Sequence, residues 1–233
     1  MEELEVAVPV ADAPIEERTV FLRRVALWTF GGLMITAIVA VLSAMFVAPV
    51  VFRGGKWVVF GVVYGSMLLS QTLVRRMVYG TNPTTGFVLG TLLQGVALGF
   101  LLLITLMLGA PNEGFSLIFQ AAGFVALSAA AMLLYVSMAK HQFSLLGAGL
   151  SMVGIPMLVL MALQFVIPMN GMAGIVVSAV FTVVSAGALL YRLNHVTHHM
   201  DSTMEVQGGY EITLSLVVFF WNLLSLLNRG RRR

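Results

Sequence analysis

The sequence contains no cysteine among its 233 residues, and this absence excludes several kinds of chemistry at once. Disulfide bonds, thiolate metal sites, cysteine nucleophiles and S-palmitoylation all require a thiol. Charged residues are also scarce, at 10% of the chain against about 25% in a typical soluble protein. Hydrophobic residues make up 59%, and the mean hydropathy is +0.98. The composition is that of an integral membrane protein, whose first expected partner is the lipid bilayer.

Carboxylates are nearly missing after Glu17, where only Glu113, Asp201, Glu205 and Glu211 remain. None of them lies in the middle of an apolar segment, where proton-coupled pumps and cation sites carry their titratable groups. Hydrolysis within a membrane needs a nucleophile beside a base, and the apolar segments offer serine without histidine or lysine. We therefore expect no enzyme, no cofactor and no proton-driven pump.

The basic residues are spread in ones and twos at the ends of the apolar segments, although the net charge is +3 and the pI about 9.6. Nucleic-acid binding requires basic residues gathered in a patch that neutralises several phosphates. Single basic residues at segment ends are typical of membrane anchoring. We expect no nucleic-acid partner.

The amino-terminal residues 1–19 are acidic and contain two prolines, so they lack the apolar surface needed to fold alone. We predict a disordered acidic tail over 1–19, a transmembrane domain over 20–229, and a basic carboxyl-terminal tail over 230–233. An acidic start followed by a long apolar run does not resemble a cleaved secretory signal.

Seven apolar segments follow the tail, and they predict an all-α, up-down bundle of seven transmembrane helices. The first six have about 18 to 25 residues each, against about 20 needed to cross a bilayer. The seventh has only about 16 uncharged residues, so it is either a short buried span or a re-entrant element. The segments are Val25–Val47, Trp57–Val74, Gly86–Gly109, Phe115–Met138, Phe143–Ile167 (with Pro156 predicting a kink), Gly171–Tyr191 and Ile212–Leu227.

Glycines recur four residues apart in the pairs Gly61–Gly65, Gly86–Gly90 and Gly95–Gly99. This spacing places small residues on one helix face, where the backbones of two helices can approach closely. Packing within the bundle is one interpretation, and homodimerisation is the other.

The distribution of lysine and arginine around the first six segments favours a cytoplasmic amino terminus, by the positive-inside rule. A spanning seventh segment places the terminal arginines outside, whereas a re-entrant one returns them to the inside. The side of the carboxyl terminus therefore stays open.

The seventh segment carries a polar stripe formed by Glu211, Ser215, Asn222 and Ser225, with Val218 interrupting it. On a helix with about 100° per residue these residues lie within about 40° of one direction. Lipid cannot satisfy such groups, so the stripe must face other helices or a wet cavity. The last helix is therefore predicted to be central.

Two further groups of side chains suggest sites. His195 and His199 lie four residues apart, a spacing that can hold a metal on a helix, with Asp201 as a further ligand; a solvated turn is the alternative interpretation. Arg75 and Arg76 end the second segment. They either extend to the membrane surface and set the topology, or one of them turns inward to pair with Glu211.

Four stretches resemble the Bax inhibitor-1 family. Tyr191–Val196 followed by Ile212–Leu227 is similar to the end of the family's sixth helix and to its seventh, with Ser-Leu and Asn-Leu motifs. Ala139–Gly147 resembles the connector after the fourth helix, and Phe21–Val25 resembles the entry to the first. The resemblance implies seven helices with the seventh in the centre, and the short loops fit a member in the bacterial inner membrane.

The resemblance also implies a function. Family members regulate cell death and calcium, one bacterial relative modulates a membrane-bound protease, and others form a pH-sensitive calcium leak gated by two aspartates with a nearby arginine. The aspartate positions fall at Arg192 and Phe219 here, and the arginine at Arg75 or Arg76. Because arginine repels calcium, we expect an inner-membrane regulator or interaction protein, acting in membrane protein quality control. The alternative is a calcium or other cation leak along the seventh helix.

Overall fold

The computed structural model describes residues 9–108, 111–138 and 171–231. In these ranges the protein is built of helices and contains no β-strand. Six helices there are long and apolar enough to cross a membrane. Four of them are single α-helices: α5 (Pro83–Leu108), α6 (Pro111–Met138), α8 (Met172–His198) and α9 (Glu205–Arg231). An all-helical membrane protein is confirmed. The fifth predicted segment, with Pro156 and the connector 139–147, lies outside the described residues.

The first two spans are each interrupted by a π-helical segment of five residues. In the first, η1 (Ser43–Val47) joins α1 (Ile15–Leu42) to α2 (Ala48–Arg53). In the second, η2 (Ser70–Val74) joins α3 (Lys56–Leu69) to α4 (Arg75–Val78). A π-helical turn frees a backbone carbonyl from the regular helical ladder, so other groups can bind it.

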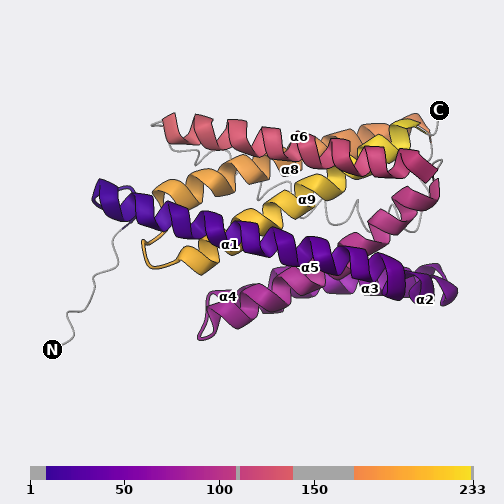
Figure 1. Cartoon of the computed structure of the whole chain (residues 1–233), viewed down its shortest axis with the longest axis horizontal. Coiled ribbons are helices and arrows are strands. Elements are labelled where there is room, and N and C mark those ends of the chain that lie inside the picture. The colour runs from indigo at the N-terminus through magenta and orange to yellow at the C-terminus, as the bar shows by residue number, and fades with distance from the viewer. Residues whose placement is uncertain (1–8, 109–110, 139–170, 232–233) are drawn as a thin grey trace.

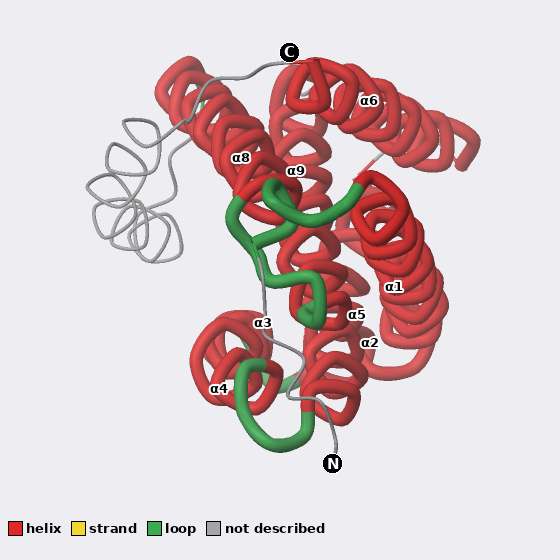
Figure 2. The backbone as a smooth tube through the Cα atoms, turned by 90° about the vertical axis from the view of Figure 1, so that its left-hand side faces the viewer, coloured by secondary structure: helices red, strands yellow, loops and turns green. Residues whose placement is uncertain are grey.

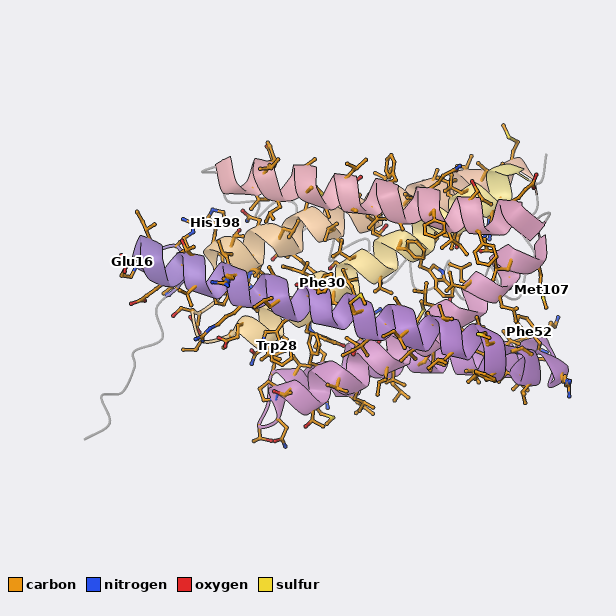
Figure 3. The ribbon with its side chains drawn as sticks, in the orientation of Figure 1. Glu16, Trp28, Phe30, Phe52, Met107 and His198 are labelled. Atoms are coloured by element: carbon orange, nitrogen blue, oxygen red, sulfur yellow. The ribbon has the colours of Figure 1, made fainter. Side chains whose placement is uncertain are left out.

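The helices run between two ends of an elongated bundle (Figure 1). We call the end that holds Glu16 and His198 the proximal end, and the end that holds Phe52 and Met107 the distal end (Figure 3). Helices α5 and α9 run from the proximal to the distal end, whereas α6 and α8 both run from the distal to the proximal end.

Helix α9 lies inside the bundle, in contact with α1, α5, α6 and α8, as the view along the bundle in Figure 2 shows. It is one uninterrupted helix of 27 residues, about 40 Å long at 1.5 Å per residue. The re-entrant alternative for this segment is therefore wrong. The polar residues Glu205, Tyr210 and Glu211 continue the helix before Ile212 because neighbouring helices supply partners for them.

The three glycine pairs differ in what surrounds them. A Cβ atom on Gly99 would lie 2.6 Å from Ser43 Cβ and 2.7 Å from the Ala40 carbonyl oxygen, so α5 packs directly on the first span there. A Cβ on Gly90 would lie 2.5 Å from the Tyr210 ring of α9. Gly61 and Gly65 meet nothing within 4 Å. The same spacing thus serves close packing in α5 and leaves an open face on α3.

The amino-terminal tail is ordered over 9–19, so the prediction of disorder throughout 1–19 is wrong for this part. Helix α1 already begins at Ile15, with Glu16 and Glu17 in its first turn, where acidic side chains are favoured by the helix dipole. Val10 is fully buried, and its N–H donates to the Met200 carbonyl at 2.9 Å. Residues 1–8 lie outside the described ranges. Of the predicted basic tail, Gly230 and Arg231 belong to α9.

Candidate functional site

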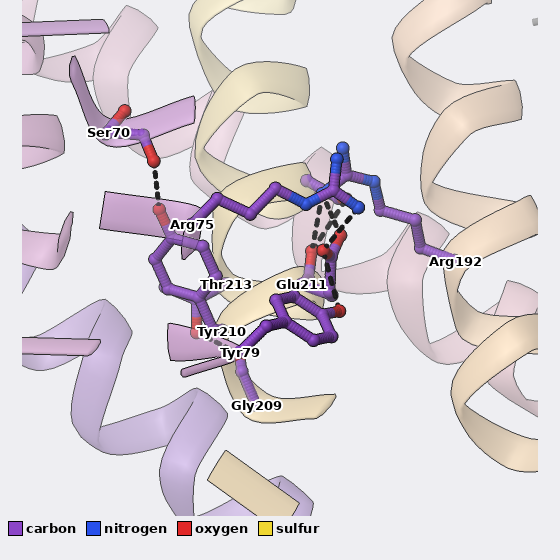
Figure 4. A network of polar contacts seen from close by, with 9 residues as sticks. Ser70, Arg75, Tyr79, Arg192, Gly209, Tyr210, Glu211 and Thr213 are labelled. Atoms are coloured by element: carbon purple, nitrogen blue, oxygen red, sulfur yellow. Dashed lines mark hydrogen bonds and ion pairs between the residues drawn. The ribbon is translucent and has the colours of Figure 1, made fainter. Parts of the chain in front are cut away.

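Glu211 is the centre of a charged cluster at the proximal end (Figure 4). Its Oε1 lies 2.9 Å from Arg75 Nη2, and its Oε2 forms an ion pair with Arg192 Nη1. The Tyr79 hydroxyl donates to Oε1 at 3.0 Å. Glu211 is 3% exposed. A buried carboxylate loses its hydration, so the ion pairs and the hydrogen bond are what make this position possible.

Three helical elements bring the cluster together. Arg75 opens α4 and Tyr79 follows the end of that helix, four residues later, so that both side chains lie on one helix face. The Arg75 guanidinium also lies 5.8 Å from the centre of the Tyr79 ring. Arg192 lies near the end of α8 and Glu211 near the start of α9. Because these helices form an antiparallel pair, the two residues lie side by side.

The electrostatics of the cluster favour a stable, positive site. Two guanidinium groups surround one carboxylate, which leaves one net positive charge. Burial and the neighbouring Glu211 carboxylate raise the pKa of Tyr79 to about 12, so its hydroxyl remains a donor at neutral pH. A divalent cation approaching Glu211 meets two fixed positive charges at close range. The cluster holds α4, α8 and α9 together and repels cations.

A second polar network lies directly beside the first. The Tyr210 hydroxyl donates to the Ser70 carbonyl at 2.6 Å, a carbonyl that lies in the π-helical segment η2. Gln94 Nε2 of α5 donates to Ser70 Oγ at 2.7 Å. All three side chains are buried. Consecutive residues of α9, Tyr210 and Glu211, therefore both bind the second span.

The rest of the predicted polar stripe does not join this cluster. Ser215 is buried and its hydroxyl donates to the Glu211 carbonyl at 2.8 Å, within its own helix. Asn222 is buried and Ser225 is partly exposed. Farther along, Asn228 Nδ2 donates to Thr105 Oγ1 of α5 at 2.7 Å. The hydroxyl of Ser215 is thus engaged within α9, while Asn228 ties the helix to α5.

Of the two positions where the resemblance places gating aspartates, only Arg192 lies in the cluster. Phe219 is 2% exposed in the apolar core, about 12 Å along α9 from Glu211. Arg75, and not its neighbour Arg76, contacts Glu211, while Arg76 is exposed. The carboxylate of the cluster therefore comes from Glu211, two helical turns before Phe219.

The predicted metal-binding residues are not gathered around one point. His195 lies within α8 and His199 caps its end, so the helix continues past Tyr191, where the sixth predicted segment ends. Their rings stack with centroids 5.8 Å apart. Asp201 instead pairs with Pro9 through the backbone. Within the described ranges, no three histidine, cysteine or acidic residues are placed to hold a metal ion.

The sequence interpretation missed Tyr79, Tyr210, Ser70 and Gln94. A signal existed for Gln94, because it is the single amide in the long apolar run of α5. A lone polar group at that depth requires an internal partner. Tyr79 could have been found from its spacing to Arg75. Nothing in the sequence indicates the π-helical segment that presents the Ser70 carbonyl to Tyr210.

Comparison with known proteins identifies a match to one protein family. The family Bax1-I, described as inhibitor of apoptosis-promoting Bax1, matches residues 18–232. The match includes all six described spans except the first turn of α1. No curated protein matches the chain.

Proposed function

The chain belongs to the Bax1-I family, and from this membership we propose that it is a regulator or interaction protein of the bacterial inner membrane. Its target is a membrane-bound protease or another complex of membrane protein quality control. The amino terminus faces the cytoplasm. The protein acts through binding to that complex and does not depend on ion flow.

One observation carries this proposal: the single carboxylate buried in α9 is held by two arginines. Arg75 and Arg192 more than neutralise Glu211, so the local charge is opposite to that of a calcium pathway. Breaking the cluster would leave a charge in a low-dielectric interior, which costs about 3–5 kcal/mol. Such a site supports a closed resting bundle.

The proposal includes seven crossings. Helix α6 ends at the proximal end, and α8 begins at the distal end, although the two helices are neighbours in contact. Because α6 and α8 run in the same direction, the chain must return from the proximal to the distal end between them. This supports one further crossing there. The predicted segment Phe143–Ile167 is long enough for it, at about 25 residues.

The regulatory role is tested by purification of the tagged full-length protein from native membranes after cross-linking. We expect repeated enrichment of one membrane complex, identified by quantitative mass spectrometry. Replacing Glu2, Glu3 and Glu5 with glutamine should weaken the association if the acidic start contributes to it. A variant with Glu16 and Glu17 replaced by glutamine is the control, because these residues lie in the first turn of α1. Recovery of the protein alone in every preparation contradicts the proposal.

A cation leak is the second candidate, because Glu211 begins a polar stripe that continues with Ser215 and Asn222. Opening would require Arg75 and Arg192 to release the carboxylate. Flux of calcium and monovalent ions into proteoliposomes, measured between about pH 6 and pH 8 where histidine titrates, tests it. The leak is eliminated if the flux does not exceed that of empty liposomes. It is also eliminated if Asn222→Leu and Glu211→Gln each conduct as much as the wild type.

A further inference from the structure

The two arginines of the cluster keep hydrogen-bond donors that Glu211 does not use. A guanidinium group has five N–H donors in a planar fork. The contacts of Arg192 within the described residues all involve Nη1, which leaves Nη2 and Nε available. Arg75 uses Nη2 for Glu211 and contacts Tyr79. Several donors therefore remain on two guanidinium groups that meet at one carboxylate.

The side chains of both arginines are partly accessible from outside the bundle. The Arg75 side chain is 51% exposed and the Arg192 side chain 26% exposed, whereas that of Glu211 is 5% exposed. The carboxylate is thus the buried part of the cluster, and the arginines form its outer layer. Figure 4 shows their guanidinium groups side by side above Glu211. A ligand can reach the arginines without entering the bundle.

The charge of this layer favours an anion. Two arginines and one glutamate leave one net positive charge. Paired guanidinium groups bind tetrahedral oxyanions through two parallel hydrogen bonds each, a geometry that lysine does not provide.

The length of α9 places the cluster just beneath the layer of lipid headgroups. Glu211 is about 9 Å along the axis from the start of α9, at 1.5 Å per residue. A helix of 27 residues is about as long as the full bilayer, including headgroup layers that each extend several ångströms beyond the hydrocarbon core. Long arginine side chains from this position extend toward the membrane surface. Phosphate groups of lipids are therefore within their reach.

We propose that Arg75 and Arg192 together form a binding site for a phosphate group at the proximal end, with Glu211 beneath it as a competing internal anion. The phosphate belongs to an anionic lipid headgroup or to a free phosphate. Because Glu211 occupies part of both guanidinium groups, its carboxylate weakens this binding. The site does not depend on whether the protein regulates a complex or conducts ions.

The test uses two probes with the purified full-length protein. Inorganic phosphate is titrated in phosphate-free detergent by calorimetry. Retention of phosphatidic acid is measured by native mass spectrometry after release from nanodiscs of phosphatidylcholine with and without phosphatidic acid. Binding in the first arm identifies free phosphate as sufficient, and binding in the second arm alone identifies a lipid headgroup.

Three variants are expected to change phosphate binding in three different ways. Arg75→Gln weakens binding about tenfold or more, the effect of losing one charge-assisted hydrogen bond. Glu211→Gln tightens it, because the competing anion is removed. Arg76→Gln removes the same charge from an exposed neighbour and leaves binding unchanged. A purely structural role for the cluster predicts no tightening in Glu211→Gln.

A double variant protects the test against misfolding. Arg75→Gln with Glu211→Gln removes both members of one ion pair, so no buried carboxylate is left short of a partner, and it keeps the net charge of the wild type. We expect it to bind about tenfold more weakly than Glu211→Gln. Absence of binding in both arms, equal loss in Arg76→Gln, or no gain in Glu211→Gln overturns the proposal.

Discussion

Helices α9 and α6 are alike in length, with 27 and 28 residues, and both are apolar enough to cross a membrane. They differ in their surroundings, since 56% of the apolar window of α9 is buried but only 17% of that of α6. The buried helix is the less apolar one, with a mean hydropathy of 1.7 against 2.1. In a soluble protein the order is the reverse. In lipid, polar groups mark the inside because only other helices can satisfy them.

The largest effect that this comparison predicts comes from leaving Glu211 unpaired. Replacing both Arg75 and Arg192 with glutamine should lower the free energy of unfolding by about 3–5 kcal/mol, because a buried charge then lacks a partner. Unfolding in detergent, followed by tryptophan fluorescence, measures it. Of the single variants, Arg192→Gln should cost more, because Arg75 is the more exposed.

The control for this prediction changes the same charge at exposed positions. Replacing Arg23 and Arg76 with glutamine should change stability by less than about 0.5 kcal/mol, as is usual on a surface. Adding Glu211→Leu to the double variant should recover much of the loss. Equal destabilisation in the two double variants contradicts the central role of Glu211.

The next effect distinguishes the two glycine faces. Gly99→Ala places a Cβ atom against Ser43 and the Ala40 carbonyl, and we expect an overpacking cost of about 1–3 kcal/mol. Gly61→Ala meets nothing within 4 Å and gains up to about 1 kcal/mol of helix propensity. Because both variants gain that propensity, their difference measures packing. Equal stabilities would show that α5 and the first span can separate locally.

An effect of similar size concerns the hydrogen bond from Tyr210 to the Ser70 carbonyl. Tyr210→Phe should destabilise the protein by about 1–3 kcal/mol, since the buried carbonyl of the π-helical segment loses its donor. Tyr191→Phe is the matched control on α8, where the ring stacks on His195. Hydrogen exchange at η2 should also rise in Tyr210→Phe alone. A change spread equally over all helices would contradict the local role.

The sequence predicts the six described spans and the central place of α9 because the bilayer requires long apolar helices and internal partners for polar groups. It does not predict which partners meet. The choice between Arg75 and Arg76 depends on the rotation of α4, which η2 shifts by inserting a π-helical turn. Residues 9–19 are ordered because Val10 contacts Met200, which is far away in the sequence. Such contacts between segments far apart leave no periodic signal.

The smallest predicted effect is a loss of stability at high pH that comes from Tyr79. The pKa of this phenol is raised from 10.0 to about 12 by burial and by Glu211. The folded state therefore resists ionisation more than the unfolded chain does, so the contribution is complete below pH 10 and is lost as the pH rises toward 12. Because the side chain is partly exposed, solvent screening keeps the effect small. Thermal midpoints between pH 8 and pH 11 should fall more steeply for the wild type than for Tyr79→Phe, and parallel curves would show that Tyr79 titrates as a free phenol.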